Sequence, residues 1–564
     1  MTTTGRKRAD TVLETIDLAS LPDEGTRVVV RQLLNDIEVL HADLGKAREE
    51  IVRLRAENAR LKGEQGPPTI RPQAGGVKGG EDVSSEGERR VPRLRRRGGK
   101  GSRLQQIRVD REEKVFLDRS GLPGDVQDKG FVAEVVQEVV LCTDTIRFLK
   151  QKWYSKGTGK TYVAPLAPGY TGQFGPRIKA LTLALYFQGQ MSEGKLLELY
   201  RSIGVVISAG QLSTMLLHGH PSLHAEHEAI ARASVEGSVW KHTDVTATRV
   251  NGENHSCHLL CDPFCTVYRT YPGKDRLTVL DVLRQGQPRR YRCNDEAEAL
   301  LTRVAVAKWV RQAVGRFPRD QDVDEATLLG WLDGVTPTLG TQQRTWIMQA
   351  LAVAAYHAQT DAPVLRALVR DDAPEYDWLT HEAALCWIHD ARHYKRLGPF
   401  FPQHHQLLRQ FRNTYWDFYR ELLAYRSHPT PADAARLAAR FDDLFSTVTG
   451  YDALDDRIAK THAKRAGLLL VLAHPEIPLH NNPAELGARL RVRKRDGSFG
   501  PRSAAGVRAW DTFHTLAATA TKLGVSLYHY LADRLSCANR LPSLASLVTA
   551  RHHQANLSAS WSLP

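Results

Sequence analysis

The sequence is poor in cysteine and has no long apolar run. Its 7 cysteines are odd in number and scattered over 564 residues, which argues against a disulfide framework and suits a reducing compartment. No stretch approaches the roughly 20 apolar residues that a membrane-spanning helix needs, and the N-terminus lacks the apolar core of a signal peptide. We therefore expect a cytoplasmic protein with no membrane partner.

Positive charge is in excess and unevenly distributed. The net charge is +14, whereas 42% hydrophobic and 25% charged residues are typical of a soluble globular protein. The chain is longer than a single hydrophobic core usually supports, so several domains are expected. The basic residues gather in two clusters: Arg89, Arg90, Arg93, Arg95, Arg96, Arg97, Lys100 and Arg103, and then Arg489, Arg491, Arg493, Lys494, Arg495, Arg502 and Arg508. Such clusters indicate a polyanionic partner.

A heptad pattern follows a tail of residues 1–24 and predicts a coiled coil over 25–63. Apolar residues recur at alternate steps of three and four, and Asn58 falls on a position that fixes register in parallel dimers. The pattern comprises Val30, Leu33, Ile37, Leu40, Leu44, Ala47, Ile51, Leu54 and Leu61. We expect self-association through residues 30–61 into a dimer or a higher assembly. The alternative is an amphipathic helix that packs on its own domain.

Residues 64–105 are rich in Gly, Pro, Ser, Glu and Arg and have no periodic apolar face. They predict a flexible, basic linker, which is either a solvated tether or a segment in which Arg95, Arg96 and Arg97 contact DNA phosphates. Residues 106–165 then alternate apolar and polar side chains, which predicts a small β-rich module.

Residues 166–235 are expected to form a helical region with a helix-turn-helix shape. In "KLLELYRSIGVVISAGQLSTML", Gly204 would make the turn and Ser208 would cap a second helix over residues 211–215. Gln211 and Thr214 on that helix could contact DNA. Many helical hairpins bind no DNA, so that alternative stays open.

After residue 236 the sequence pattern changes to one that predicts β-strands. Asn251-Gly252 separates two strand-like runs and is a strong hairpin signal, and "DPF" predicts a second turn, giving a three-stranded antiparallel meander. Helices are expected over 294–360, with Trp309, Trp331 and Trp346 in their core. "APVLRALVR" then predicts a buried strand that ends at Asp371 and Asp372, and "HEAALCWIHDARHYKRL" predicts a helix.

Three acids from distant positions suit a divalent-cation site. Asp244 lies within a strand, where aspartate is disfavoured, Asp371 or Asp372 ends the buried strand, and Glu485 precedes the second basic cluster. Carboxylates are the ligands Mg²⁺ prefers, and paired cations catalyse phosphodiester chemistry. The alternatives are a solvent-facing edge position for Asp244 and a helix cap for the Asp pair.

Glu485 has a specific alternative of its own. With Asn482 as N-cap and Pro483 as the first helical residue, Glu485 would complete a capping box. The basic residues that follow it, Arg489, Arg491, Arg493 and Lys494, would form either a solvated face or a wall that grips phosphates. His389 and His393, one helical turn apart, could share a ligand, although solvent-facing histidines are commoner.

Three stretches together resemble a family of DDE transposases, the insertion-sequence family sixty-six. The family's "DET" strand is similar to "HTDVTATRV" at Asp244. Its aspartate ahead of "CWAHARR" is similar to "VRDDAPEY" ahead of "CWIHDARHY", and its "IPIDNNPAER" is similar to "IPLHNNPAEL" with the basic segment that follows. The last match agrees in order, spacing and chemistry. The order of the N-terminal segments is similar as well.

The resemblance implies an α/β fold with a ribonuclease-H-like catalytic domain over 236–535, helical insertions at about 294–360 and 400–470, and a tail over 536–564. It implies that Asp244, Asp371 and Glu485 bind two Mg²⁺ ions, for which Mn²⁺ can substitute, with Asp372 as the alternative to Asp371. Asn481 and Asn482 would fix the start of the helix. The family's zinc-binding cysteine pairs are not matched, because Cys142 stands alone, so we expect the β-rich module to be zinc-free.

The implied activity is DNA transposition, with cleavage at element ends and strand transfer into target DNA. The expected partners are double-stranded DNA and a second copy of the chain, and the need for helper proteins stays open. The expected location is the bacterial cytoplasm, in association with the nucleoid. Two alternatives remain: a DNA-binding regulator without catalysis, and a metal-dependent nuclease that does not join strands.

Overall fold

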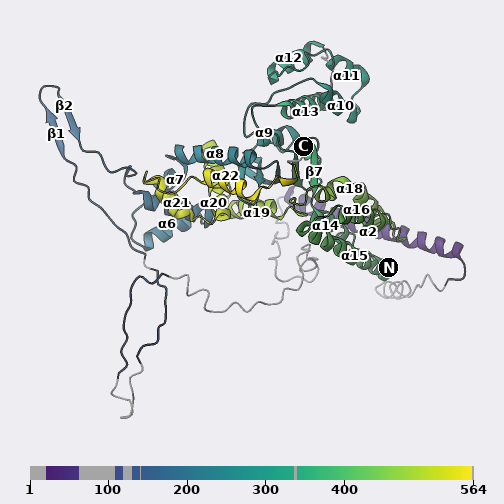
Figure 1. Ribbon diagram of the computed structural model, residues 1–564, viewed down its shortest axis with the longest axis horizontal. Helices are drawn as coiled ribbons and strands as arrows, with labels where there is room; N and C mark the ends of the chain where they lie inside the picture. The colour runs from purple at the N-terminus through teal and green to yellow at the C-terminus, as the bar shows by residue number, and fades with distance from the viewer. Residues whose placement is uncertain (1–20, 62–107, 119–129, 140, 336–338, 562–564) are drawn as a thin grey trace.

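The computed structural model describes residues 21–61, 108–118, 130–139, 141–335 and 339–561. The fold is mixed α/β, with a central sheet and two groups of helices that extend from it (Figure 1). In these residues no helix has the length and apolar character needed to cross a membrane.

The central sheet has five strands in the order β5-β4-β3-β6-β7. The first three form an antiparallel meander, and β6 and β7 continue the sheet parallel to β3. The strands are β3 (Trp240–Val250), β4 (Glu253–Cys261), β5 (Thr266–Tyr271), β6 (Ala367–Arg370) and β7 (Glu382–Leu385). The meander and the buried strand before Asp371 are confirmed, whereas β7 is formed by residues expected to begin a helix.

The turn between β3 and β4 explains the register of the meander. Asn251 and Gly252 have φ values of 50° and 87°, the left-handed conformation that a two-residue hairpin turn requires. Val250 therefore pairs with Glu253 and, further along, Asp244 pairs with Leu259.

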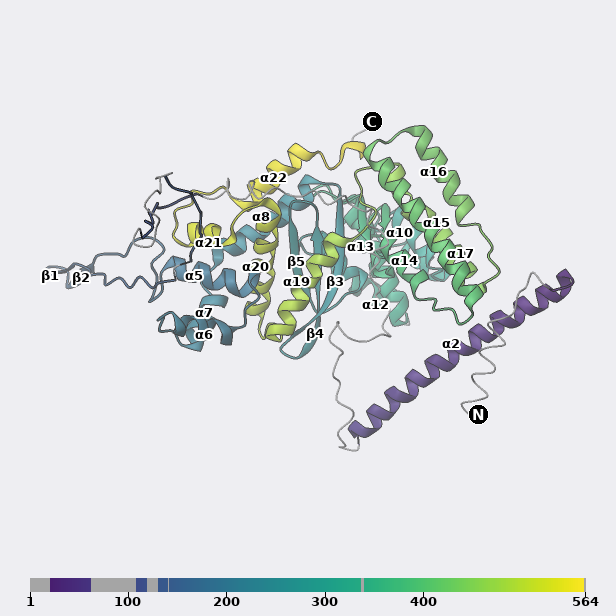
Figure 2. The same cartoon turned by 90° about the horizontal axis from the view of Figure 1, so that it is seen from below.

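Helices cover both faces of the sheet. On one face, α19 (Asn482–Ser498) and α20 (Ala504–Leu523) lie across the meander (Figure 2), where Leu259 packs with Ala488 and Ala518. On the other face, the neighbouring Leu260 packs with α9 (Arg276–Leu283) and α13 (Thr341–Ala358). Adjacent strand residues point to opposite faces, so each face of the sheet has its own apolar core.

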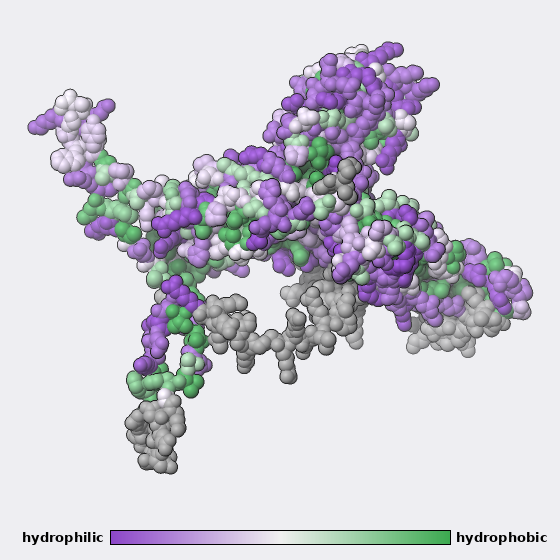
Figure 3. Space-filling model, in the orientation of Figure 1, coloured by the Kyte–Doolittle hydropathy of each residue, from purple (hydrophilic) through white to green (hydrophobic). Residues whose placement is uncertain are grey.

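The described N-terminal part differs from the expected β-rich module. Between residues 106 and 165 the described residues form one two-stranded hairpin, β1 (Lys152–Ser155) and β2 (Lys160–Val163), and otherwise no strand. Alternating apolar residues such as Val132 and Leu149 are 98% and 90% exposed, so the described residues offer them no second layer to pack against. This segment projects from the body, with hydrophobic and hydrophilic residues mixed along it (Figure 3).

The helix-turn-helix shape is confirmed as a structure. α6 (Glu193–Ser202) and α7 (Ala209–Leu217) are joined through Gly204, whose φ is 83°. Ser208 caps α7 in a full capping box with Gln211. The remaining helices of this region are α5 (Pro176–Leu183), the π-helix η2 (Ala184–Gln188) and α8 (Pro221–Gly237).

The first insertion is helical, as expected over 294–360. It contains α10 (Asp295–Arg303), α11 (Lys308–Val314), α12 (Glu325–Val335) and α13 (Thr341–Ala358), preceded by α9 (Arg276–Leu283). Trp331 and Trp346 pack against the buried cluster of this lobe. Trp309 is 54% exposed, so its expected place in the core was wrong.

The second helical group follows β7. It contains α14 (Trp387–Lys395), α15 (Pro402–Ser427), α16 (Pro431–Leu444), α17 (Asp452–His462), α18 (Arg465–Leu468) and the short η4 (Leu470–Leu472). The short η3 (Pro374–Tyr376) precedes β7, and its Tyr376 packs in the first lobe. One stripe of α15, from Leu408 to Leu422, is buried against Trp387 and Phe441, as its 3-4 spacing predicts.

The expected tail after residue 536 is instead part of the folded body. α21 (Leu527–Leu535), α22 (Leu544–Ala555) and η5 (Ala559–Trp561) end the described chain. Leu544 and Val548 on α22 are fully buried, and His552 lies 2.9 Å from Asp262 at the end of β4. Because that carboxylate also pairs with the buried Lys241, a charged network fixes α22 to the sheet.

The predicted coiled-coil segment is a single helix, α2 (Glu24–Leu61). Its first half contacts the second helical group through the buried Leu34, Asn35 and Glu38. The rest of α2 extends past the body (Figure 2). Most of the heptad face is exposed, with exposed fractions between 48% and 68% at Leu33, Leu40, Leu44, Ile51 and Leu54, whereas Val30 and Ile37 are half-buried. Packing on its own chain therefore uses mainly a different face from the heptad, and the coiled coil stays a prediction.

Glu38 fixes α2 to the body, so Glu38→Ala is expected to release the helix. Its carboxylate accepts the backbone N–H groups of Phe400 and Phe401 at 2.9 and 3.0 Å and the ring N–H of His404 at 2.9 Å. Burial alone would raise the pKa of Glu38, but these hydrogen bonds outweigh it and lower the pKa. The docking therefore persists above the ordinary carboxyl pKa and is lost as the pH falls through the lowered value.

Amide hydrogen exchange along α2 measures this release. Loss of the carboxylate leaves the buried N–H groups of Phe400 and Phe401 unsatisfied, a penalty of about 1–3 kcal/mol, and exchange in residues 24–40 should accelerate accordingly. Asp36→Asn, on the exposed face of the same helix, is the matched control and should change little. Equal exchange in Glu38→Ala and the unmodified chain would contradict the docking role.

Candidate active site

Asp244 lies in β3, and Asp371 directly follows the end of the neighbouring parallel strand β6. Trp240 pairs with Ala367, and His242 with Val369; extended by two residues, this register places Asp371 level with Asp244. Side chains at the same level of adjacent strands point to the same face. The Asp371 charge also raises the pKa of Asp244, so the two carboxylates lie near each other although they are 127 residues apart in the sequence.

Glu485 is brought to the same place by the start of α19. Asn481 donates from Nδ2 to the carbonyl of Thr243 at 2.7 Å, and its Oδ1 lies 3.0 Å from His242 Nδ1. Its backbone N–H donates to Cys386 Sγ at 3.2 Å. Asn481 thus joins β3, the start of α14 and the first turn of α19, which sets Glu485 opposite Asp244.

The capping-box alternative for Glu485 is wrong. The N-cap of α19 is Asn481, one residue earlier than expected, and no side chain caps this helix by a hydrogen bond. Asn482 is the first helical residue. The Glu485 carboxylate instead turns to α14, where Arg392 Nη2 donates to Oε2 at 2.9 Å.

The three carboxylates act on one another electrostatically. Burial, together with the charges of Asp371 and Glu485, raises the pKa of Asp244 to about 6 against the opposing effects of the Val245 N–H and Arg392. Burial and the same Asp244 and Asp371 charges raise the pKa of Tyr376. Like charges gathered in a partly buried place are destabilising unless a cation binds among them.

Glu485 and His389 each present a buried polar atom without a hydrogen bond. Glu485 Oε1 and His389 Nδ1 lie 3.5 Å apart, and neither has a hydrogen-bond partner in the described chain. Arg392 Nη1 lies 3.2 Å from His389 Nε2. Because arginine can only donate, Nε2 is the accepting nitrogen, and the proton of a neutral His389 ring is on Nδ1, towards Glu485.

Two sets of candidate ligands meet at Glu485: the carboxylates of Asp244, Asp371 and Glu485, which interact electrostatically, and a more compact set with Cys386 and His389. The chemistry of the carboxylates fits a metal better. Cys386, His389 and Glu485 present ligand atoms within 4.8 Å of one another. Yet burial raises the pKa of Cys386 to about 11, so its sulfur is a thiol, and His389 Nδ1 carries a proton. One oxygen of Asp244 and one of Asp371 accept backbone N–H groups, and in the described chain the second oxygen of each accepts no hydrogen bond. Three such carboxylates are suited to Mg²⁺, which needs few protein ligands.

Asp372, the alternative ligand, lies elsewhere. Its carboxylate pairs with Lys464. Burial alone would raise the pKa of Asp372, but the Lys464 contact outweighs burial and leaves the pKa lowered. Successive residues leaving a strand point to opposite sides, which separates Asp372 from Asp244.

Comparisons with known proteins give one relative and no fold match. No family model and no solved structure matches the chain. The uncharacterized protein y4jO of Sinorhizobium fredii (strain NBRC 101917 / NGR234) is 33% identical to it over 313 residues, which cover 55% of this chain and 95% of y4jO. The chain belongs to the y4jO family. Since the description of y4jO names no activity, the function of this y4jO-family chain is argued from its site.

The basic residues after Glu485 divide between two faces of α19. Arg489 and Arg493 are exposed. Arg491 is 1% exposed, with Nη2 3.0 Å from Asp511 Oδ1. Lys494 is fully buried, donates to the carbonyl of Met191 at 2.7 Å and has its pKa lowered by burial to about 7. The expectation that Arg491 and Lys494 contact DNA was therefore wrong for this y4jO-family member.

The other expected DNA contacts have mixed outcomes. Gln211 is exposed, but its carboxamide accepts the Ser208 N–H at 3.1 Å and donates to Gln173 at 2.8 Å, so it supports the helix start. Thr214 remains exposed on α7. Arg95, Arg96 and Arg97, and the whole expected linker, lie outside the described residues.

Residue-by-residue reading of the sequence missed the contribution of α14 to the site. His389 and Arg392 are three positions apart, one helical turn, and both face Glu485. The signal was present in "CWIHDARHY", where polar residues recur with helical spacing directly after a strand. The helical spacing also predicts a shared ligand for His389 and His393, but the charges that act most on His393 are those of Arg457 and Asp372.

Proposed function

We propose that this chain is a DDE-type DNA transposase whose Asp244, Asp371 and Glu485 bind two Mg²⁺ ions. The observation that carries the proposal is the mutual proximity of three acids from β3, the end of β6 and α19, expressed in the raised pKa of Asp244. Carboxylates grouped in this way can hold the paired cations that catalyse phosphoryl transfer on a phosphodiester.

The fold supports this proposal. An antiparallel meander joined to two strands parallel to its first member is compatible with a ribonuclease-H-like domain. The helical lobes, at residues 295–358 and 387–468, fall where helical insertions are expected. The N-terminus of α19 points its positive dipole end at the acids, which favours the negative charge of a bound phosphodiester.

Each residue of the site has a task in the reaction. The bound cations would activate the attacking oxygen and stabilise the leaving oxygen. Asp244 must be deprotonated to bind a cation, so its pKa of about 6 places the loss of activity on the acid side of neutrality. Arg392 orients the Glu485 carboxylate through Oε2, and Asn481 fixes the separation of β3 and α19.

The exposed surfaces suit a DNA-bound dimer. Arg489 and Arg493 lie four residues apart on the solvent-exposed face of α19. From there they could contact DNA phosphates next to a phosphodiester bound at Glu485, which is on the same helix. The exposed heptad face of α2 offers a parallel coiled coil with a second copy. Thr214 on α7 is the remaining candidate for groove contact.

Asp371→Asn and Asp372→Asn form a matched pair for testing the activity. The substrate is a DNA fragment that carries the inverted repeats flanking the protein's own gene, with Mg²⁺ and a second DNA as target. Asp371→Asn is expected to lower cleavage and strand joining by at least about 10³-fold, because several kcal/mol of transition-state stabilisation depend on the cations. Asp372→Asn should remain close to the unmodified chain.

Equal loss in both variants, or retained joining in Asp371→Asn, would contradict the proposed site. Cut ends that are never joined would indicate a nuclease, and Mg²⁺-independent DNA binding without any cutting would indicate a regulator. Circular dichroism of both variants shows whether the loss reflects chemistry or folding.

A further inference from the structure

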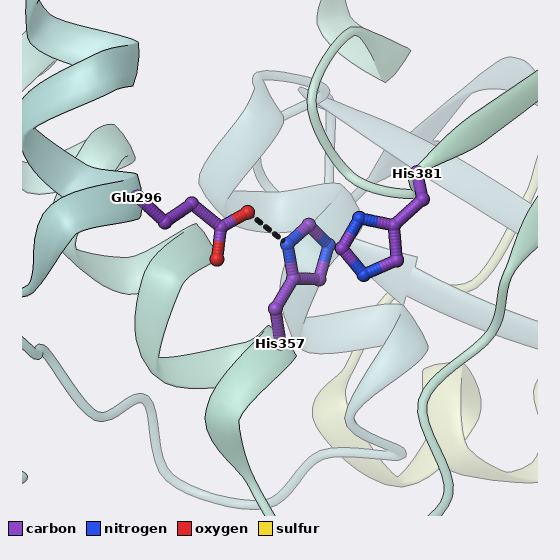
Figure 4. Close-up of side chains that lie close together, drawn as sticks. All are labelled: Glu296, His357 and His381. Atoms are coloured by element: carbon purple, nitrogen blue, oxygen red, sulfur yellow. Dashed lines mark hydrogen bonds and ion pairs between the residues drawn. The ribbon is translucent and has the colours of Figure 1, made fainter.

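A second group of ligand-type side chains lies outside the candidate active site. Glu296 on α10, His357 in the last turn of α13 and His381 immediately before β7 converge where the first insertion meets the sheet (Figure 4). One ligand atom from each lies within 4.8 Å of the other two. Three separate elements thus supply two imidazoles and one carboxylate to a single point.

The hydrogen bonds of His357 call for a positive charge. Its Nδ1 lies 2.6 Å from Glu296 Oε1, and its Nε2 lies 3.2 Å from the carbonyl oxygen of Leu379. Both partners are acceptors, and a neutral imidazole has one N–H. A doubly protonated ring would satisfy both, and so would a cation at Nδ1 that also binds Glu296, with the remaining N–H on Nε2 donating to Leu379.

The second arrangement is a common one for metal-binding histidine. A ligating ring usually donates its other N–H to a backbone carbonyl or a carboxylate, which fixes the tautomer. The His381 ring lies beside His357, with centroids 4.4 Å apart and planes at 35°, which adds a second nitrogen ligand. His357 has a side-chain exposure of only 5%, so its charge would be largely desolvated if no partner were present.

We propose that Glu296, His357 and His381 form a transition-metal site that takes Zn²⁺. Two imidazoles with one carboxylate are typical ligands of zinc, whereas Mg²⁺ prefers oxygen alone. Ligand distances of about 2.0–2.1 Å set tetrahedral ligands roughly 3.3 Å apart, so Glu296 and His357 would separate slightly on binding. The exposed position of His381 leaves the fourth ligand position to water.

The site would join the first insertion to the strand that leads into the active site. β7 starts at the residue after His381 and ends one residue before Cys386, from which α14 carries His389 and Arg392 to Glu485. Bound zinc would therefore hold α10 and α13 against the start of β7. The proposal does not depend on the transposase activity.

Zinc binding by the full chain tests the proposal directly. Metal-stripped protein, held in excess Mg²⁺ to occupy the carboxylates, is titrated with Zn²⁺ alone and, separately, with Co²⁺ alone, whose visible absorption reports nitrogen ligands in a tetrahedral site. We expect one zinc per chain at this site. His381→Asn and His357→Gln should each weaken that binding by at least about 100-fold, since even outer-shell changes weaken metal sites by 10–100-fold.

His529→Asn, a solvent-exposed histidine on α21, is the control and should bind zinc as the unmodified chain does. Hydrogen exchange adds a readout apart from affinity, because zinc should slow exchange at the start of β7 in the unmodified chain and not in His381→Asn. Equal zinc affinity in the unmodified chain and both cluster variants would overturn the proposal. So would a chain that binds no zinc and whose His357 ring is doubly protonated at neutral pH by NMR.

Discussion

Replacing Asp244 with asparagine is expected to abolish DNA cleavage and, at the same time, to stabilise the metal-free protein. The carboxylate has a pKa of about 6 in the folded chain against an ordinary value of 3.8. A raised carboxyl pKa means that ionisation opposes folding, so the penalty is absent below about pH 4, grows towards pH 6 and is complete above it. Two units correspond to about 3 kcal/mol, and asparagine keeps the Oδ1 that accepts the Val245 N–H at 2.8 Å.

Thermal unfolding of the metal-free protein from pH 4 to pH 8 measures this effect. The Asp244→Asn variant should unfold at a higher temperature than the unmodified chain above pH 6, and the two should converge near pH 4. Added Mg²⁺ or Mn²⁺ should stabilise the unmodified chain and leave Asp244→Asn unchanged. A variant that is no more stable at pH 8, or that still cleaves DNA, would show that Asp244 does not share its site with other acids.

The parts of the site that depend on local sequence were predictable. Asn251-Gly252 allows a two-residue turn, which fixes the register of β3 with β4, and a short apolar run ending in two acids gives β6. Local sequence could not decide between Asp371 and Asp372, because these adjacent side chains differ only in the face of the sheet to which they point. The face is set by the parallel pairing of β6 with β3, which joins residues more than a hundred positions apart. The sequence of one strand alone does not reveal that pairing.

The basic helix shows how a charge pattern can mislead. Arg489 and Arg493 lie about 40° apart around a helix, and Arg491 and Lys494 lie about 60° apart on nearly the opposite side. The buried stripe of α19 begins with small residues, Ala484, Gly487 and Ala488, and continues through Arg491 and Lys494. A side chain at Gly487 would meet Leu259 Cδ2 at 2.7 Å, so close packing on the sheet selects this face. The cations on it have partners that lie far away in the sequence and could not be anticipated.

Arg491→Ala is expected to be the most destabilising single change on α19. The guanidinium donates to Asp511 Oδ1 at 3.0 Å and to Thr270 Oγ1 at 2.9 Å, and it lies 4.7 Å from the Trp510 ring centroid. Its removal leaves the buried Asp511 carboxylate without its cation, a change that typically costs about 3–5 kcal/mol. Denaturant unfolding followed by circular dichroism should show the loss as a lower midpoint.

Arg489→Ala and Arg493→Ala separate this structural role from DNA contact. Both side chains are exposed, so their removal should change stability by no more than about 0.5 kcal/mol. If each neutralises one phosphate, each variant should bind DNA more weakly and lower the slope of log affinity against log salt by about 1. Arg491→Ala, measured at a temperature where it stays folded, should keep that slope, since a side chain enclosed by β5 and α20 cannot reach a phosphate. A stable Arg491→Ala with a reduced salt slope would instead mean that α19 turns its Arg491 face outward when DNA binds.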